Sequence, residues 1–512
     1  MDRDSGPPQT RSRRLPARTG ASLVLLALLA ALWMAAKVCL FNELAYTSDL
    51  FSFAQMSHSF LLGRPLLHEN SSGLHRLHHN TYLILLFAPL SHAWGALGIF
   101  SGSLGLSLLS WLAALRTAVR EGAGRFIERW GTAAALLAGP VAFWIWDDPV
   151  YGWHSELLYL PLSVLFVLSL ERRSRWAWLW AALLVLNREE GAVLAWSLHL
   201  LWILTGDRED GHRLRRPLQA TAVWLAIFLA GFAWLRLQPG ASSDRLTAAL
   251  THLPRLATDP ELRQAVAREL GWLLAILAIG LLPLATRRAW KRIGWTPVLA
   301  LPPLAVILVG SATYASSAGL FIQHGPLWPP RFAILWGLTA AAVLLGLPSR
   351  GPGTDRGKPW SWMLACAASI LLQAVWLQQA RSYVLADRVI PWRAAEPQPA
   401  SALTPAEKRF LSCLEDRVPV RTAVATEGTL FRYFHRHELV WPDHVWLAWE
   451  PPALVVCDRE RRLLFTSPQC EPLRQKLLDR GLREVSVGGI AATAEAGLEP
   501  IVSACAEGSN PG

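Results

Sequence analysis

The sequence is poor in charge. Charged residues make up only 17% of its 512 residues, whereas about a quarter of an ordinary soluble protein is charged. Hydrophobic residues reach 52%, and several apolar runs attain the roughly 20 residues that a helix needs to span a bilayer. The scarcity of charge therefore excludes a soluble protein and predicts a polytopic membrane protein that is mainly α-helical.

Several site motifs are also missing. No G-x-x-x-x-G-K phosphate loop occurs, so neither a nucleotide site nor a nucleotide-sugar donor is expected. The six cysteines contain no Cys-x-x-Cys spacing, which gives no support to a cysteine metal site. Four of them lie in the tail, where one disulfide would form if the tail faces an oxidising compartment. These are Cys413, Cys457, Cys470 and Cys505.

Basic residues dominate the charge that is present. The formal net charge is +11, but the arginines and lysines fall in short clusters between apolar runs, such as "RRAWKR". This distribution is typical of the positive-inside rule, so no nucleic-acid partner is expected. It places the N-terminus on the inner side of the membrane and the C-terminal tail on the outer side.

The apolar runs predict about 11 crossings. The first follows an arginine-rich start and exceeds the roughly 7–15 apolar residues of a signal peptide, so we expect a retained helix. The run 81–115 is too long for one helix, and "APLSHAWG" is expected to break it into a dipping segment and one span. The predicted crossings are 21–41, 81–115, 130–146, 155–171, 176–186, 191–205, 218–236, 269–286, 296–312, 331–347 and 360–379.

The chain divides into five parts. After the last crossing, Thr404 and Pro405 carry the signature of a helix N-terminus, and short β-rich runs follow, which together predict a small α/β domain outside the membrane. The predicted parts are a basic N-terminus (1–20), a transmembrane core (21–380), a linker (381–400), the α/β domain (401–504) and a disordered tail (505–512).

Ionisable residues of the core gather in segments on the predicted outer side. Such groups at membrane depth are costly and usually face a bundle interior or a wet cavity, so we expect the outer segments to share one cavity. The candidates are Asp49 and His79 in the first outer loop, Asp147, Asp148, His154 and Glu156 in "WDDPVYGWHSELL", Arg188, Glu189 and Glu190 in "NREE", and His324 and Arg331 in "IQHGPLWPPR".

Each motif also has a structural explanation. Asp49 in "TSDL" is either a helix cap or a functional carboxylate, and the Asp147–Asp148 pair is either solvated or part of a site. His75 and His79 would share a helical face, as interfacial residues or as metal ligands. The charged "NREE" lies between two short helices, within the depth of the membrane, and so favours function.

In this order and spacing, "DLFSFAQ", "HRLHHN", "WHSELLYLPL" and "NREEGAVLA" resemble the bacterial membrane-protein family called "domain of unknown function 2079". In that family a D-L-x-x-F-x-Q segment is followed by a His-containing loop, an F-H-P-E motif and a K-E-E motif. Here Trp153 and Ser155 replace the Phe and Pro of F-H-P-E, and Arg188 stands for Lys.

That family is similar to the GT-C superfamily of membrane glycosyltransferases. The resemblance implies transfer of a sugar from a polyprenyl-phosphate donor to an envelope acceptor at the outer membrane face. GT-C enzymes place a catalytic carboxylate in the first outer loop, just after the first helix. Asp49 occupies that place.

An inverting transfer needs a general base for the acceptor and cations for the leaving phosphate. We assign the base to Asp49, with Asp148 or Glu156 as second choices, and the phosphate to Arg188 and Arg331 with His154 or His324. His79, Glu189 and Glu190 are further substrate-binding candidates. A divalent metal such as Mg or Mn, clamped by Asp49 and Asp147, stays undecided.

Two other functions remain open. A transporter or flippase for a lipid-linked or anionic substrate would commonly show interrupted helices in both halves, and the sequence has one such pair, around "NREE". A non-enzymatic envelope protein with the tail as binding module would leave the charged outer motifs unexplained.

Overall fold

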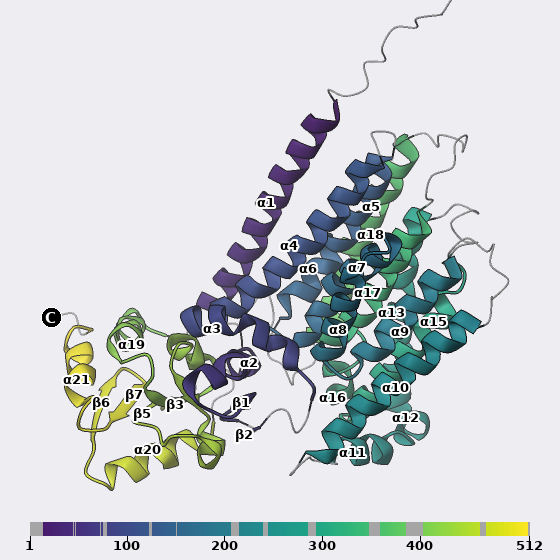
Figure 1. The fold of residues 1–512 in the computed structure, drawn as a ribbon. Helices are drawn as coiled ribbons and strands as arrows, with labels where there is room; N and C mark the ends of the chain where they lie inside the picture. The colour runs from purple at the N-terminus through teal and green to yellow at the C-terminus, as the bar shows by residue number, and fades with distance from the viewer. Residues whose placement is uncertain are drawn as a thin grey trace, which may run out of the picture.

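The computed structural model describes residues 14–44, 46, 48–71, 73–74, 79–121, 125–149, 151–205, 215–238, 244–284, 293–347, 359–385, 403–460 and 467–509. Helices form a long bundle, and a small sheet domain lies at one end of it (Figure 1). That end is called the domain end below. His75 and most of the predicted linker lie outside the described residues.

Six helices in the described part of the chain are long and apolar enough to cross a membrane. They confirm a membrane protein, whereas the predicted count of 11 crossings is not confirmed. The six are α1 (Arg14–Asn42), α4 (Ala96–Arg120), α10 (Arg215–Leu237), α13 (Pro260–Leu281), α17 (Pro329–Gly346) and α18 (Pro359–Leu385).

The other predicted crossings are helices too, but shorter ones. The run 130–146 is divided where Gly139 precedes Pro140, because proline is favoured in the first turn of a new helix. The shorter helices are α5 (Phe126–Leu137), α6 (Pro140–Asp147), α7 (Tyr159–Glu171), α8 (Trp176–Asn187), α9 (Gly191–Thr205) and α15 (Thr296–Ala312).

The helix α17 forms the centre of the bundle. All of its residues except Arg331 are buried, and among the α-helices it packs mainly against α7, α9 and α15. The Trp336 indole on α17 donates a hydrogen bond to the Leu136 carbonyl at 2.9 Å. This helix is therefore surrounded by protein, and its first turn carries Arg331 into the site described below.

Short elements fill the domain end of the bundle. They carry Asp49 and Glu156, and most of the other predicted site residues lie in the loops that join them to the helices. They are α2 (Ser48–His58), η1 (Ser59–Leu62), β1 (His68–Glu69), β2 (Gly73–Leu74), η3 (Tyr82–Phe87), α3 (Ala88–Trp94), η4 (Ser155–Leu158), α11 (Asp244–His252), α12 (Arg255–Thr258) and α16 (Ala318–Gln323), whereas η5 (Leu282–Leu284) follows α13 at the opposite end.

The C-terminal domain is a five-stranded mixed sheet in the order β4-β3-β5-β7-β6. The strand β3 is parallel to both β4 and β5, and β7 is antiparallel to β5 and β6. Its elements are α19 (Pro405–Arg417), β3 (Ala423–Thr426), η7 (Gly428–Phe434), β4 (Glu438–Val440), η8 (Pro442–Leu447), β5 (Leu454–Asp458), α20 (Cys470–Leu478), β6 (Arg483–Val487), β7 (Ile490–Ala494) and α21 (Glu499–Glu507).

Two local features of this domain bear on the predictions. Thr404 caps α19 in a capping box with Glu407, as the sequence indicated. The last helix, α21, continues to Glu507, whereas the sequence predicted a disordered tail from residue 505. A disulfide between Cys413 and Cys505 ties α21 to α19, and a second one joins Cys457 to Cys470.

The C-terminal domain packs directly on α2 and on the turn before α4. Gln55 and Asn70 both donate to the Leu439 carbonyl of β4, at 2.8 and 2.6 Å. Gly95, in the break predicted within 81–115, has φ +56°, and a Cβ there would lie 2.3 Å from the His435 carbonyl oxygen. Glycine is needed at this position for both its backbone conformation and its closeness to the domain.

Substitution of Gly95 by alanine should therefore destabilise the protein. The left-handed conformation alone costs an L-residue about 1–2 kcal/mol, and the methyl group would also push His435 away. We expect a lower thermal midpoint for G95A in nanodiscs. The control is G105A inside the following helix α4, where nothing lies within 4 Å of the added Cβ; equal midpoints for the two variants would contradict the prediction.

Candidate functional site

A polar cavity of about 230 Å³ opens at the domain end of the bundle. Segments far apart in the sequence meet around it: α2, the loop before η3, residues 151–156, Arg188 and the start of α17. The predicted site residues among its lining are Asp49, His79, His154, Glu156, Arg188, His324 and Arg331. In this arrangement the charged outer segments that the sequence singled out contribute side chains to one cavity.

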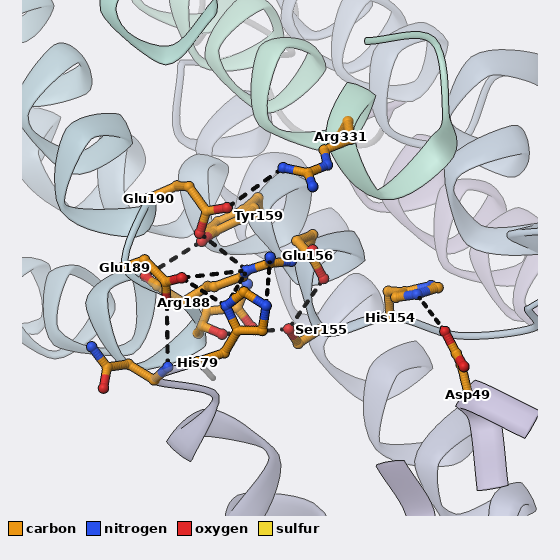
Figure 2. A network of polar contacts seen from close by, with 12 residues as sticks. Asp49, His79, His154, Ser155, Glu156, Tyr159, Arg188, Glu189, Glu190 and Arg331 are labelled. Atoms are coloured by element: carbon orange, nitrogen blue, oxygen red, sulfur yellow. Dashed lines mark hydrogen bonds and ion pairs between the residues drawn. The ribbon is translucent and has the colours of Figure 1, made fainter. Parts of the chain in front are cut away.

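Asp49 lies in the first turn of α2, where a carboxylate interacts favourably with the helix dipole. Its side chain is 42% exposed, and its Oδ2 is 3.2 Å from Nε2 of His154. The other ring nitrogen of His154, Nδ1, lies 2.7 Å from Oδ2 of Asp148. One imidazole thus joins an accessible carboxylate to a buried one, and Figure 2 shows the contact with Asp49.

The backbone explains how Asp148 reaches this position. It is the C-cap of α6 and adopts φ 40°, a left-handed conformation that aspartate tolerates better than most residues. Its side chain is fully buried behind His154 and does not line the cavity. This placement suits a residue that positions the imidazole better than one that meets a substrate.

The charge of His154 follows from its two neighbours. Burial disfavours the imidazolium, but the carboxylates of Asp148 and Asp49 outweigh that effect and raise the pKa of His154 to about 9. The imidazole is therefore protonated at neutral pH, with both N–H groups donating to carboxylates. In this state it fixes the orientation of Asp49.

Arg188 is the centre of a second cluster, shown in Figure 2. Its guanidinium contacts the carboxylate of Glu156, and its Nε lies 3.3 Å from Glu190 Oε2. Its Nη2 is 2.9 Å from Nε2 of His79, whose Nδ1 is 2.7 Å from Glu189 Oε1. The "NREE" segment between α8 and α9 therefore supplies three members of a buried network.

Arg331 and an aromatic group form the opposite wall. Nη1 of Arg331 lies 3.9 Å from Glu190 Oε1, at the outer limit for an ion pair. His324 stacks on Tyr314 with 4.0 Å between ring centroids. Tyr151 contacts both His154 and Trp328 edge-on, at 5.1 and 5.4 Å. The cavity is thus charged on one side and aromatic on the other.

The hypothesis of a metal held by Asp49 and Asp147 does not fit this arrangement. Asp147 accepts a hydrogen bond from the Tyr46 hydroxyl at 3.3 Å and lies outside the cavity. Among the described residues, no group of three or more His, Cys, Asp or Glu side chains is placed to hold a metal ion. His75, the partner proposed for His79, lies outside the described residues.

Lys37, Tyr151 and Glu269 were not singled out in the sequence. Lys37 is buried, and its ammonium group donates to the carbonyls of Trp146 and Asp147 at 2.8 and 2.6 Å. Glu269 is fully buried on α13 and accepts from the Leu327 amide at 3.2 Å, beneath the loop that carries His324 and Trp328. A lone charge inside a predicted span was the signal available for both residues.

Removal of the Asp148 charge should lower the pKa of His154 from about 9 to near or below its ordinary value of 6.5, because burial then opposes protonation with less compensation. We expect ¹⁵N NMR of histidine-labelled protein to report neutral His154 at pH 7.5 in Asp148→Asn and imidazolium in the wild type. The control is the exposed Asp443→Asn; an unchanged titration in Asp148→Asn would contradict this assignment.

The same pKa sets a pH dependence of stability. Because the folded-state pKa of His154 is raised, its stabilising contribution is full below the unfolded value of about 6.5 and is lost as the pH rises through about 9. The thermal midpoint of the wild type should therefore fall between pH 7 and pH 10 by more than that of Asp148→Asn.

Removal of the Arg188 charge should destabilise the protein strongly. Arg188→Met leaves Glu156 and Glu190 buried without their cation, a situation that typically costs about 3–5 kcal/mol. Arg188→Met with Glu156→Gln should recover part of the loss, and Arg175→Met on an exposed loop should have little effect. Thermal unfolding in nanodiscs measures all three; a Met variant as stable as the wild type would count against the network.

No protein-family model and no curated protein matches this chain, so membership of the family named above stays a prediction. Among solved structures, the arabinofuranosyltransferase AftD from mycobacteria is similar over 92% of this chain, with 15% sequence identity and a TM-score of 0.39. The chain spans 40% of the length of that protein. At this level of likeness, the chemistry of the site rests on its own residues.

Proposed function

We propose that this chain is an integral-membrane glycosyltransferase of the GT-C type, which moves a sugar from a polyprenyl-phosphate donor to an envelope acceptor. The observation that carries the proposal is the geometry of Asp49. It is an accessible carboxylate at the edge of a polar cavity, held through His154 by a buried second carboxylate. This arrangement resembles that of many acid–base catalysts, in which a further side chain orients the catalytic base.

Asp49 would act as the general base of an inverting displacement. Its carboxylate accepts the proton of the acceptor hydroxyl while that oxygen forms a bond to the anomeric carbon. The bond from the anomeric carbon to the donor phosphate oxygen breaks, and the electron pair leaves with the phosphate. His154 stays protonated and keeps Asp49 in place, because Asp148 holds the other side of the ring.

Arg331 is the better candidate for the leaving phosphate. It lines the cavity and lies 3.9 Å from the Glu190 carboxylate. The Arg188 guanidinium already contacts Glu156, Glu190 and His79, so a positioning role suits it. The same contact with Arg188 makes Glu156 a weaker candidate for the base than Asp49.

The aromatic wall suits the sugar. Tyr314 and His324 present stacked ring faces, and Trp328 and Tyr151 close the same side. Sugar rings have apolar C–H faces and polar edges, so an aromatic wall facing a charged one matches both. The prenyl chain would run from this cavity between helices into the bilayer.

The two disulfides support the predicted orientation. Disulfides persist in oxidising compartments and are rare in the cytosol. Both of them, Cys413–Cys505 and Cys457–Cys470, lie in the C-terminal domain, which favours an extracytoplasmic domain on a bacterial cytoplasmic membrane. The cavity lies at the same end of the bundle and would face the same side.

Asp49→Asn tests the proposal. Asparagine keeps the shape of the side chain but cannot accept the proton, so the rate should fall by about 10²–10⁴-fold. The measurement is release or transfer of sugar from radiolabelled polyprenyl-phosphate sugars by protein in nanodiscs. The control variant is Asp416→Asn, an exposed carboxylate on α19, which should keep wild-type turnover.

Two outcomes would contradict the proposal. Equal turnover by wild type and Asp49→Asn would make Asp49 a helix-terminus residue and move the base elsewhere. Movement of an intact donor across sealed vesicles, with no cleavage by the folded wild type, would identify a transporter.

A further inference from the structure

A second cavity, of about 320 Å³, lies where the membrane core meets the C-terminal domain. On the core side it is lined by the end of α2, the following loop and α3, and on the domain side by the segments that lead into β3 and β4. Its size falls within the range of about 300–1,000 Å³ that small-molecule sites occupy. None of its lining belongs to the first cavity.

Basic side chains dominate this second cavity. Arg64, Arg421 and Arg436 line it, against the two carboxylates Glu438 and Glu450. Glu438 is already compensated, because it contacts the Arg64 guanidinium and accepts from the Asn70 amide at 2.8 Å. Arg421 and Arg436 are exposed and line the cavity, whereas Glu450 interacts electrostatically with Arg64.

Histidines complete the polar lining of this cavity. Nε2 of His437 lies 3.1 Å from the Val418 carbonyl and donates to it, and its Nδ1 is buried. Burial lowers the pKa of His437, and burial together with His92 lowers the pKa of His58 to about 4. Both rings are therefore neutral at pH 7, and the arginines supply the positive charge of the cavity.

We propose that this cavity is a binding site for a phosphate group. A hydrogen phosphate or phosphomonoester offers anionic oxygens to Arg421 and Arg436, and its two negative charges match the two exposed guanidinium groups. The proposal does not depend on the reaction assigned to the first cavity.

The helix α2 separates the two sites. Asp49 lies at its start and His58 at its end, nine residues apart, which corresponds to about 14 Å of helix. A phosphate in the second cavity would bridge α2 and α3 to the C-terminal domain. The phosphate would come either from a lipid headgroup or from a soluble molecule.

The test uses the full-length protein in phosphatidylcholine nanodiscs, with binding of inorganic phosphate followed by ³¹P NMR line broadening. The cavity variant is Arg421→Gln with Arg436→Gln, and the charge-matched control is Arg417→Gln with Arg480→Gln, two exposed arginines of the same domain outside the cavity. We expect affinity to fall at least about tenfold in the cavity variant and to stay unchanged in the control. Glu450→Gln should tighten binding several-fold, since it removes a carboxylate from the cavity lining.

The outcomes separate cleanly. No binding to the wild type, or equal loss in the cavity variant and the control, would overturn the proposal. Given specific binding, nanodiscs that contain phosphatidic acid, whose headgroup is a phosphomonoester, distinguish the source. Weaker phosphate binding in them supports a lipid headgroup as the occupant, and unchanged binding supports a soluble phosphate. Asp49→Asn should bind phosphate like the wild type, so failure of the glycosyltransferase proposal leaves this result intact.

Discussion

Burial of the Arg188 guanidinium is the constraint on which the site depends. A cation inside a helical bundle is tolerated only with close counter-charges and hydrogen-bond partners. These partners come from different parts of the chain: Glu156 from η4, Glu190 from the break before α9, and His79 from the loop before η3. The gap between α8 and α9 exists at this depth because the "NREE" side chains cannot face lipid. The network thereby fixes the positions of the segments that enclose the first cavity.

Asp147 and Asp148 are adjacent in the sequence and were predicted as a pair, but it is Asp148 that contacts His154. Asp147 and Asp148 are neighbours, yet they face different surroundings, because Asp148 leaves α6 in a left-handed conformation. Asp147 turns towards Tyr46, and Asp148 turns towards His154. A buried carboxylate that holds an imidazolium can orient a third group without meeting the substrate. Asp49 is that third group; it lines the cavity together with His154, and Asp148 lies behind them.

Local signals in the sequence were sufficient for many elements and for seven of the residues that line the first cavity. Thr404 and Pro405 begin α19, Gly95 ends α3, and "NREE" separates two short helices, as expected. Three features needed the folded chain. The run 130–146 divides at Gly139 because Pro140 starts a new helix, which changes the helix count. The contact between Asp148 and His154 depends on the turn that follows α6. The Lys37 ammonium group donates to the carbonyl of Asp147, which lies 110 residues away in the sequence. Periodicity and spacing carry no information on such contacts.

The position of the C-terminal domain follows from hydrogen bonds to a backbone carbonyl of its sheet and from close packing against the core. β4 receives hydrogen bonds from Gln55 and Asn70, and Gly95 leaves room for the His435 carbonyl. The helix α2 therefore has one end in the first cavity and packs along its length against the domain. A group bound between the domain and the end of α2 would act on the helix that carries Asp49. The position of Asp49 is therefore linked, through about three turns of α2, to any group that binds between the C-terminal domain and the end of this helix.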